Sequence, residues 1–108
     1  MRKNKSDYWR GWRSELLALL ALQQLRTAGI ITDFRKRDER GIDFYLDLPN
    51  GLEMPLQVKS SEGGKNVHLR KHSTIPCISV NHHQPESTVV KMLYNEIFGY
   101  IQTFRNDR

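Results

Sequence analysis

Apolar positions dominate the chain over about residues 12–28, where they recur on most sides of a helical turn. This pattern predicts a helix that other elements cover on several sides. Ser14 or a neighbour is the candidate N-cap, and Gly29 is the candidate C-cap. The apolar positions of this helix are Leu16, Leu17, Leu19, Leu20, Leu22 and Leu25.

A second helical pattern runs from residue 85 or 86 to about residue 104. Pro85 and Glu86 at its start are typical of a helix N-terminus. Gly99 in its interior costs about 1 kcal/mol relative to alanine, which indicates either close packing or a weak point. The predicted apolar stripe consists of Val90, Leu93, Ile97, Ile101 and Phe104.

Between these helices, shorter apolar segments predict strands. Residues 30–36 and 75–81 are two of them, and residues 37–41 are predicted to form a turn. Residues 60–74 are polar and basic, which predicts a loop that contains one short helical turn or none.

Residues 41–61 predict a β-hairpin, and the length of its loop decides which side chains share a face. A two-residue turn at Asn50-Gly51 would mix polar and apolar residues on both faces. A three-residue loop that includes Pro49 suits a type I turn with a bulge and leaves one face wholly apolar, so it is the predicted register. The apolar pairs are then Leu48–Leu52, Leu46–Met54, Phe44–Leu56 and Ile42–Val58, opposite a face with Asp47–Glu53, Tyr45–Pro55 and Asp43–Gln57.

In this register Asp43 and Gln57 lie opposite each other, and Lys59 follows on the same face. Directly opposite residues have Cβ atoms about 5 Å apart, so these functional groups can converge. Carboxylate and amide oxygens ligate hard cations such as Mg²⁺, and a nearby lysine can orient a water or stabilise charge on a phosphate. Glu15 would complete the metal shell if the first turn of the first helix packs over the hairpin.

The order of these residues resembles the PD-(D/E)xK phosphodiesterase superfamily, which has the restriction-endonuclease-like fold. Glu15 stands on the first helix, Asp43 in "GIDF", and Gln57 and Lys59 in "LQVKSS". The short chain and the "VKSS" ending look most like archaeal-type Holliday junction resolvases and transposon-encoded endonuclease subunits, some of which carry Gln-x-Lys. The resemblance covers residues 15–81. Together with the last helix it implies an α/β fold with a restriction-endonuclease-like core, in which a mixed four-stranded sheet is flanked by an N-terminal and a C-terminal helix.

The resemblance further implies a metal-dependent endonuclease that hydrolyses DNA phosphodiesters, including branched DNA of the Holliday junction type. Mg²⁺ or Mn²⁺ would be held by Glu15, Asp43, Gln57 and the Val58 carbonyl, and Lys59 would assist the attacking water. Two features depart from the family pattern. Gln57 replaces the usual acid, which lowers metal affinity, and the helix between the third and fourth strands is reduced to a loop. The alternative is a non-catalytic domain of the same fold that binds nucleic acid or a protein.

The chain has 108 residues, which fits one domain over residues 1–108 with a basic, flexible segment at residues 1–10. Its formal net charge of +5 suits a polyanionic partner without identifying one. Cys77 is the single cysteine, so an intramolecular disulfide is excluded and a buried, inert thiol in the cytoplasm is expected. The apolar run of residues 16–22 is too short to span a membrane.

Basic and hydroxyl side chains near the predicted site are the candidates for contacts with the DNA backbone. A homodimer is expected, because one site per chain cuts one strand, and its interface is sought on the first or last helix. Trp12 is predicted to pack on the first helix. The backbone-contact candidates are Arg10, Arg13, Arg35, Lys36, Arg37, Arg40, Ser60, Ser61, Lys65, Arg70 and Lys71.

The chain has four histidines, in two pairs, and they raise the alternative of a zinc site. His68 and His72 are four residues apart, and His82 and His83 are adjacent. No cysteine stands near them in a zinc-binding pattern, so solvated loop histidines near DNA are the favoured interpretation.

Overall fold

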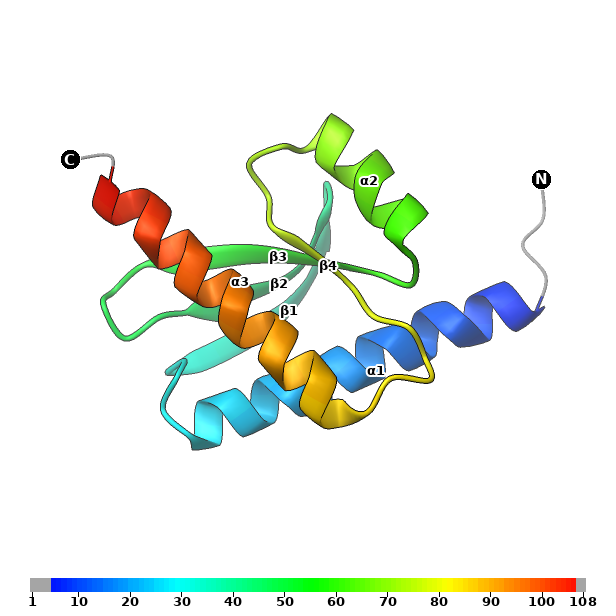
Figure 1. The fold of residues 1–108 in the computed structure, drawn as a ribbon, viewed down its shortest axis with the longest axis horizontal. Coiled ribbons are helices and arrows are strands. Elements are labelled where there is room, and N and C mark those ends of the chain that lie inside the picture. Colours follow the sequence, from blue (N-terminus) through cyan, green and yellow to red (C-terminus); the bar gives the residue numbers. More distant parts are fainter. Residues whose placement is uncertain (1–4, 107–108) are drawn as a thin grey trace.

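The computed structural model describes the backbone of residues 5–106 and the side chains of residues 12–104. It is an α/β fold with a mixed four-stranded sheet and a helix at each end, as predicted. Within the described residues, no helix is long and apolar enough to cross a membrane. The elements in chain order are α1 (Lys5–Thr27), β1 (Asp33–Glu39), β2 (Ile42–Asp47), β3 (Glu53–Lys59), α2 (Glu62–Lys71), β4 (Cys77–Ser79) and α3 (Glu86–Asn106) (Figure 1).

The strands lie in the order β1-β2-β3-β4. The first three are antiparallel neighbours, and β4 runs parallel to β3. A parallel pair needs a crossover connection, and α2 supplies it. β1 forms one edge of the sheet and carries mostly charged, exposed residues, which disfavour pairing with another chain.

The hairpin of β2 and β3 has the predicted three-residue loop. Gly51 has a φ of 88°, its N–H donates to the Leu48 carbonyl over 3.0 Å, and the Leu48 N–H donates to the Leu52 carbonyl over 2.9 Å. The ladder runs from Asp47–Glu53 to Phe44–Leu56, which confirms the register. The predicted pairs Asp43–Gln57 and Ile42–Val58 lie beyond its end.

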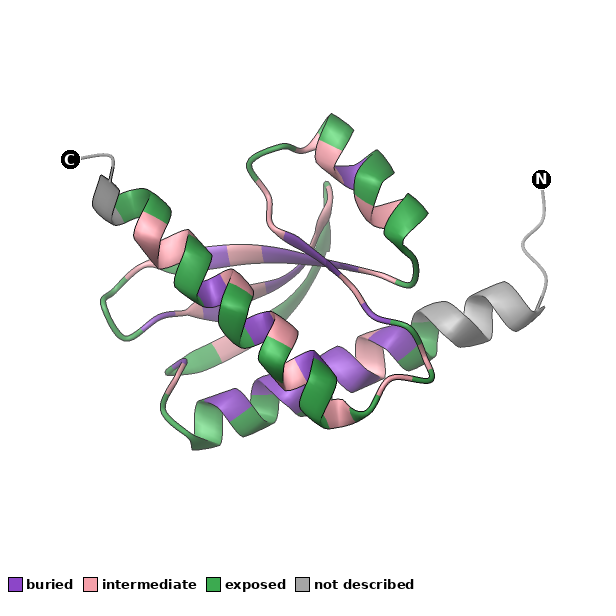
Figure 2. Ribbon diagram, in the orientation of Figure 1, coloured by how far each residue is buried: buried purple, intermediate pink, exposed green. Residues whose placement is uncertain are grey.

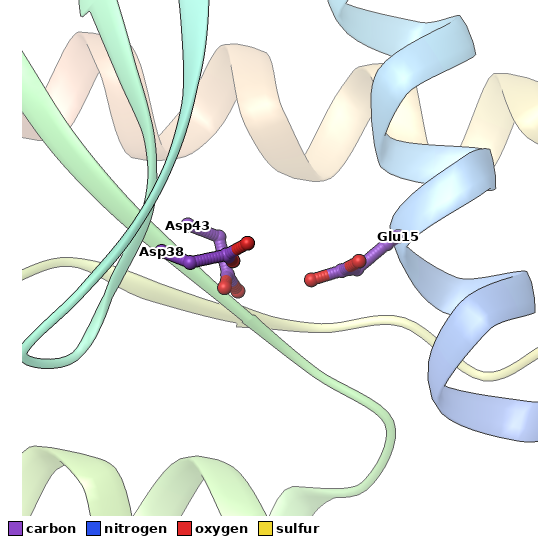
Figure 3. Close-up of side chains that lie close together, drawn as sticks. All are labelled: Glu15, Asp38 and Asp43. Atoms are coloured by element: carbon purple, nitrogen blue, oxygen red, sulfur yellow. The ribbon is translucent and has the colours of Figure 1, made fainter. Parts of the chain in front are cut away.

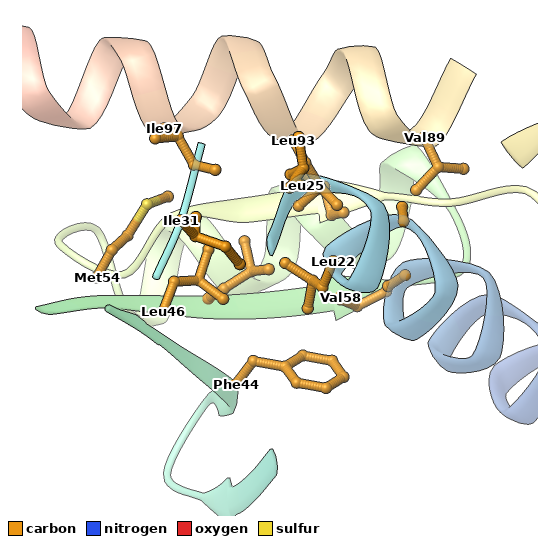
Figure 4. Packing of buried hydrophobic residues seen from close by; sticks show 14 of the residues in the cluster. Leu22, Leu25, Ile31, Phe44, Leu46, Met54, Val58, Val89, Leu93 and Ile97 are labelled. Carbon is orange, nitrogen blue, oxygen red and sulfur yellow. The ribbon is translucent and has the colours of Figure 1, made fainter. Parts of the chain in front are cut away.

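The core lies between the apolar face of this hairpin and the two long helices. α1 and α3 contact each other, and their buried positions gather where they cross (Figure 2). Each fully buried large apolar side chain contributes about 1.5–3 kcal/mol relative to an exposed one. Figure 4 shows how the core residues meet, among them Leu22, Leu25, Phe44, Leu46, Met54, Leu93 and Ile97.

α1 begins at Lys5, earlier than predicted, and Ser14 is not its cap. Ser14 is buried inside the helix, and its hydroxyl donates to the Val80 carbonyl over 2.6 Å. The hydrogen bond joins α1 to the segment that follows β4. Ser14 therefore fixes how α1 is seated, a role that its position at the head of an apolar run does not reveal.

Gly29 ends α1 as predicted. Its φ is 78°, its N–H donates to the Arg26 carbonyl, and the Ile30 N–H donates to the Leu25 carbonyl. These two bonds form a Schellman motif, in which a glycine takes the left-handed conformation. The exposed side of α1 differs from the prediction at Trp12, whose side chain is 60% exposed instead of packed on the helix.

α2 corrects the prediction of a loop over residues 60–74. Ser61 caps it by accepting a hydrogen bond from the Gly64 N–H over 3.0 Å. His68 is buried in it, with Nε2 3.0 Å from the Ile75 carbonyl oxygen. Two glycines and the lack of an apolar stripe concealed the helix, because its stability comes from the cap and from packing. A helix therefore connects β3 and β4, where a loop was predicted.

β1 is shifted toward the C-terminus from the predicted residues 30–36. The turn has only two central residues, Arg40 and Gly41, with φ angles of 37° and 82°. Glu39 pairs with Ile42, so the strand continues through residues that were predicted to turn. β4 is also shorter than predicted, because its pairing with β3 covers only three positions.

α3 matches its predicted limits closely, and its predicted stripe faces the core except at Phe104. Val89, Leu93 and Ile97 are buried, whereas Val90 is half-buried and Phe104 is 43% exposed. Gly99 is exposed, and a Cβ built on it would meet no atom within 4 Å. The glycine is therefore a weak point and not a close packing contact.

Gly99→Ala is expected to stabilise the protein by about 1 kcal/mol, because alanine is the better helix former and the added methyl group meets open space. Urea unfolding should show a higher midpoint with an unchanged slope.

Gly41→Ala is the matched control and should destabilise the protein. Its φ of 82° is unfavourable for alanine, and its Cβ would lie 2.8 Å from the His72 ring. Equal or lower stability of Gly99→Ala would contradict the assignment of a weak point.

Candidate metal site

Three carboxylates from three different elements meet at one end of the sheet. Glu15 comes from α1, Asp38 from β1 and Asp43 from β2, and Figure 3 shows their side chains directed toward one another. One oxygen from each lies within 4.8 Å of the others. This acid cluster contains two of the predicted metal ligands, Glu15 and Asp43, and one acid that sequence reasoning missed.

Asp43 is the buried member of the acid cluster, with 8% of its surface exposed. It lies directly beyond the last pair of the β2–β3 ladder. There its Oδ2 accepts a hydrogen bond from the Val58 N–H over 2.8 Å. The carboxylate is thus fixed by a backbone donor of the neighbouring strand, which holds it more firmly than a flexible side chain would.

Asp38 reaches the cluster because β1 is irregular. The register of β1 against β2 shifts between Lys36 and Glu39, and a bulge of this kind re-aims side chains. Simple alternation along a strand gives no signal for such a placement. The visible clue was the acid pair Asp38-Glu39, which interrupts the basic run of residues 35–40 just before the turn.

Glu15 is placed by the seating of α1. It is half-buried and follows Ser14, whose hydroxyl binds the Val80 carbonyl. The sequence left open whether this part of the first helix packs over the hairpin. In the structure α1 does contact β3 of the hairpin.

Lys36 lies among the three acids. Its Nζ is 2.8 Å from Asp38 Oδ1, 3.1 Å from Glu15 Oε1 and 3.9 Å from Asp43 Oδ1. The same nitrogen lies 5.1 Å from the centre of the Phe44 ring. Sequence reasoning had assigned Lys36 to DNA contacts, and the structure places its ammonium among the acids.

The charges in the cluster shift the pKa values of both kinds of group. Burial raises the pKa of Asp43, the charges of Glu15 and Asp38 raise it further, and the Val58 N–H and Lys36 only partly oppose this. Partial burial works against the charged form of Lys36, but hydrogen bonds to Asp38 and Glu15 outweigh it, so the pKa of Lys36 is raised. The acid cluster therefore favours a bound cation.

Gln57, Val58 and Lys59 occupy the end of β3 beside the cluster. Gln57 is buried and directly precedes Val58, the residue that anchors Asp43. The Lys59 stem lies toward α2, since a Cβ on Gly64 would be 3.5 Å from the Cβ of Lys59. Lys36, not Lys59, is the lysine that the structure places in contact with the acids.

The predicted backbone-contact residues divide into engaged and available side chains. Arg35 pairs with Asp47 and Glu53, Lys36 lies in the acid cluster, and Ser61 caps α2. The side chain of Arg10 lies outside the described residues. Five of the described basic side chains are exposed and have no acidic partner within 4 Å: Arg13, Arg37, Arg40, Arg70 and Lys71. Ser60 is exposed and Lys65 is half-buried.

Two groups of these available cations lie close together. The turn at Arg40 and Gly41 approaches the end of α2, where a Cβ on Gly41 would meet the His72 ring. Arg70 and Lys71 belong to the last turn of that helix. The backbone positions of Arg40, Arg70 and Lys71 are therefore close to the turn that joins β1, the strand of Asp38, to β2.

The histidines do not form a zinc site with other described ligands. The acid cluster is the one group of three or more potential His, Cys, Asp or Glu ligands found among the described residues. His68 is a buried helix residue and not a solvated loop residue as predicted, and burial lowers its pKa. Burial likewise raises the pKa of the Cys77 thiol to about 11, which fits the predicted inert cysteine.

The ligand chemistry of the acid cluster fits Mg²⁺ or Mn²⁺. These hard cations prefer carboxylate oxygens, and a few carboxylates plus water complete their shells. The cluster offers three carboxylates and no sulfur or imidazole. No protein-family model, no curated protein and no solved structure matches this chain, so function is inferred from the fold and the site.

Asp43→Asn is expected to raise the free energy of unfolding at neutral pH in EDTA. The folded protein raises the pKa of Asp43 above its ordinary 3.8, so ionisation is less favourable there than in the unfolded chain. This cost is absent below the ordinary pKa and grows as the pH rises through the raised value. Asparagine keeps an oxygen for the Val58 N–H, and urea unfolding from acid to neutral pH measures the difference.

Asp33→Asn is the control with the opposite sign. The Phe34 N–H and Arg26 lower the pKa of Asp33, so its charged form stabilises the fold above its ordinary pKa. That contribution disappears as the pH falls through the lowered value. If Asp43→Asn were less stable than the wild type at neutral pH, the assigned cost of burial and charge repulsion at Asp43 would be wrong.

Proposed function

We propose that this protein is a metal-dependent endonuclease that hydrolyses DNA phosphodiesters. The observation that carries the proposal is the meeting of Glu15 and Asp43, which stand on different elements and were selected from the sequence as metal ligands. The raised pKa of Asp43 adds support: burial is its main cause, the charges of Glu15 and Asp38 add to it, and a bound divalent cation would offset both.

The order of elements also supports a relationship to the PD-(D/E)xK superfamily. Helix α1, three antiparallel strands, helix α2 and the parallel strand β4 follow the order that the resemblance implied. The sequence suggested two departures from the family pattern, and one of them was the lack of a helix between the third and fourth strands. That helix is present as α2. The other, Gln57, is offset in charge by Asp38, so the site still contains three acids.

The residues divide the work as follows. Glu15, Asp38 and Asp43 hold the Mg²⁺ or Mn²⁺ ion, and the Gln57 amide and the Val58 carbonyl are further oxygen ligands at the end of β3. A divalent ion at such a site polarises a phosphodiester and lowers the pKa of bound water. The Val58 N–H keeps Asp43 in place, and Lys59 orients water or stabilises charge on the phosphate.

The surface around the site suits a nucleic acid. Arg37, Arg40, Arg70 and Lys71 are exposed and have no acidic partner among the described residues. Such side chains bind phosphates without reading base sequence. Trp12 is 60% exposed, less than one helical turn before Glu15, and its ring can stack on an unpaired base of a branched DNA.

Two strands of DNA require two sites, so we propose that the active form is a homodimer. The exposed Tyr94 and Phe98 on α3 are available for its interface. The compartment we propose is the cytoplasm, where a single buried thiol such as Cys77 stays reduced.

The test is cleavage of a labelled four-way junction, a linear duplex and a single strand in Mg²⁺ or Mn²⁺. Asp43→Ala and Lys59→Ala should each lower the cleavage rate by about a hundredfold or more while DNA binding persists. Lys91→Ala, an exposed lysine on α3, is the control and should cleave normally. DNA binding without cleavage by the wild type in either metal would instead favour a non-catalytic domain of the same fold.

The proposed DNA surface makes a separate prediction about salt. Replacing Arg40 or Arg70 with glutamine should weaken binding of all DNA structures alike and reduce the slope of log K against log salt by about 1 for each lost phosphate contact. Binding isotherms at several salt concentrations measure this slope. Arg35→Gln serves as control, since Arg35 is already engaged by Asp47 and Glu53, and an equal effect there would argue against the assigned surface.

A further inference from the structure

Lys36 places a positive charge where the proposed metal ion would bind. Its ammonium nitrogen lies 2.8 Å from Asp38, 3.1 Å from Glu15 and 3.9 Å from Asp43. We propose that Lys36 is a tethered counter-ion, which neutralises the acid cluster in the metal-free protein and is displaced when a divalent ion enters. This inference rests on the proposed metal site and concerns how that site is filled.

The position of Lys36 follows from the strand that carries it. Lys36 is the cross-strand partner of Phe44 in the β1–β2 ladder, and its ammonium lies over the Phe44 ring. Arg35, the preceding residue, pairs instead with Asp47 and Glu53. Successive side chains of a strand point to opposite faces, so these neighbours neutralise separate groups of acids. Among the described residues, Lys36 is the one cation with ion pairs to the acid cluster.

An ammonium and a metal ion cannot both use these oxygens in their present geometry. A Mg²⁺ ion binds carboxylate oxygens at about 2.1 Å and would stand within a few ångströms of the ammonium. Two positive charges at that separation repel strongly where water is partly excluded. Metal binding must therefore break the ion pairs of Lys36 with Glu15 and Asp38.

Lys36 is able to leave the cluster. Its side chain is 43% exposed, so an outward path to solvent exists. Lysine is a compact charge on a flexible four-carbon stem, unlike the planar fork of arginine. The exchange needs only a change of side-chain rotamers in β1 and no movement of the sheet.

The exchange has two consequences for the site. The fold tolerates three converging acids before any metal is bound, because the Lys36 side chain supplies a positive charge that is part of the chain itself. Metal affinity is correspondingly lower, since each binding event must first separate existing ion pairs. Removal of the lysine charge should reverse both effects, destabilising the metal-free protein and tightening metal binding.

The experiment measures Mn²⁺ binding by titration calorimetry on the wild type, Lys36→Met and Arg35→Met at one fixed pH. Lys36→Met should bind Mn²⁺ about tenfold more tightly, which corresponds to the loss of two or three partly exposed ion pairs. Arg35→Met loses the same charge and its own ion pairs on the same strand, and should remain within about twofold of the wild type. Lys36→Gln guards against a folding defect of the methionine variant and should also bind more tightly.

A second measurement follows stability instead of affinity. In EDTA, Lys36→Met should unfold at a lower urea concentration than the wild type, and saturating Mn²⁺ should stabilise it more than it stabilises the wild type. Lys36→Arg restores the charge and should bring both values back toward those of the wild type.

The outcomes separate this inference from the proposed function. If the wild type binds Mn²⁺ and both Lys36→Met and Lys36→Gln bind it equally or more weakly, the counter-ion role is wrong while the metal site stands. If Mn²⁺ binds neither the wild type nor any Lys36 variant, the metal site itself is wrong, and the counter-ion role fails with it. Tighter binding in both Lys36 variants but not in Arg35→Met would establish the exchange.

Discussion

The repulsion among three carboxylates at one end of the sheet is the constraint on which the rest of the site depends. Glu15, Asp38 and Asp43 approach within 4.8 Å, and one of them is buried. Like charges in such a place are unfavourable unless a cation or hydrogen-bond donors offset them. Lys36 and the Val58 N–H do so in this protein. Acidic groups that are held together despite their repulsion are more typical of a functional site than of a solvated surface.

Backbone groups help to position Asp43 and the part of α1 that carries Glu15. The Val58 N–H binds Asp43 where the β2–β3 ladder ends, and the Val80 carbonyl binds Ser14 beside Glu15. Both backbone groups belong to the region where β3 and β4 run in parallel, so the two acids share one rigid support. A site on rigid elements keeps its geometry when the ligand is absent. Such support would suit the metal centre that we propose.

The sequence predicted the hairpin register and with it the place of Asp43, because a slip of one residue would have exposed apolar side chains and buried polar ones. Glu15 was selected separately, as an acid on the first helix. The sequence predicted neither α2 nor the position of Asp38. α2 lacks an apolar stripe and depends on the Ser61 cap and the buried His68, which are tertiary features. Asp38 depends on a bulge, and Lys36 on the acids around it. Local patterns record burial and alternation, whereas these residues are placed by contacts distant in sequence.

The buried thiol of Cys77 has a practical consequence of a different kind. It is 1% exposed, it lies in the strand that pairs with β3, and its pKa of about 11 leaves almost none of it as thiolate at neutral pH. A thiol reagent can therefore reach it readily only when β4 separates from its neighbours. The single native cysteine is a built-in reporter of how often the rigid support of the acids opens, and it needs no engineered label.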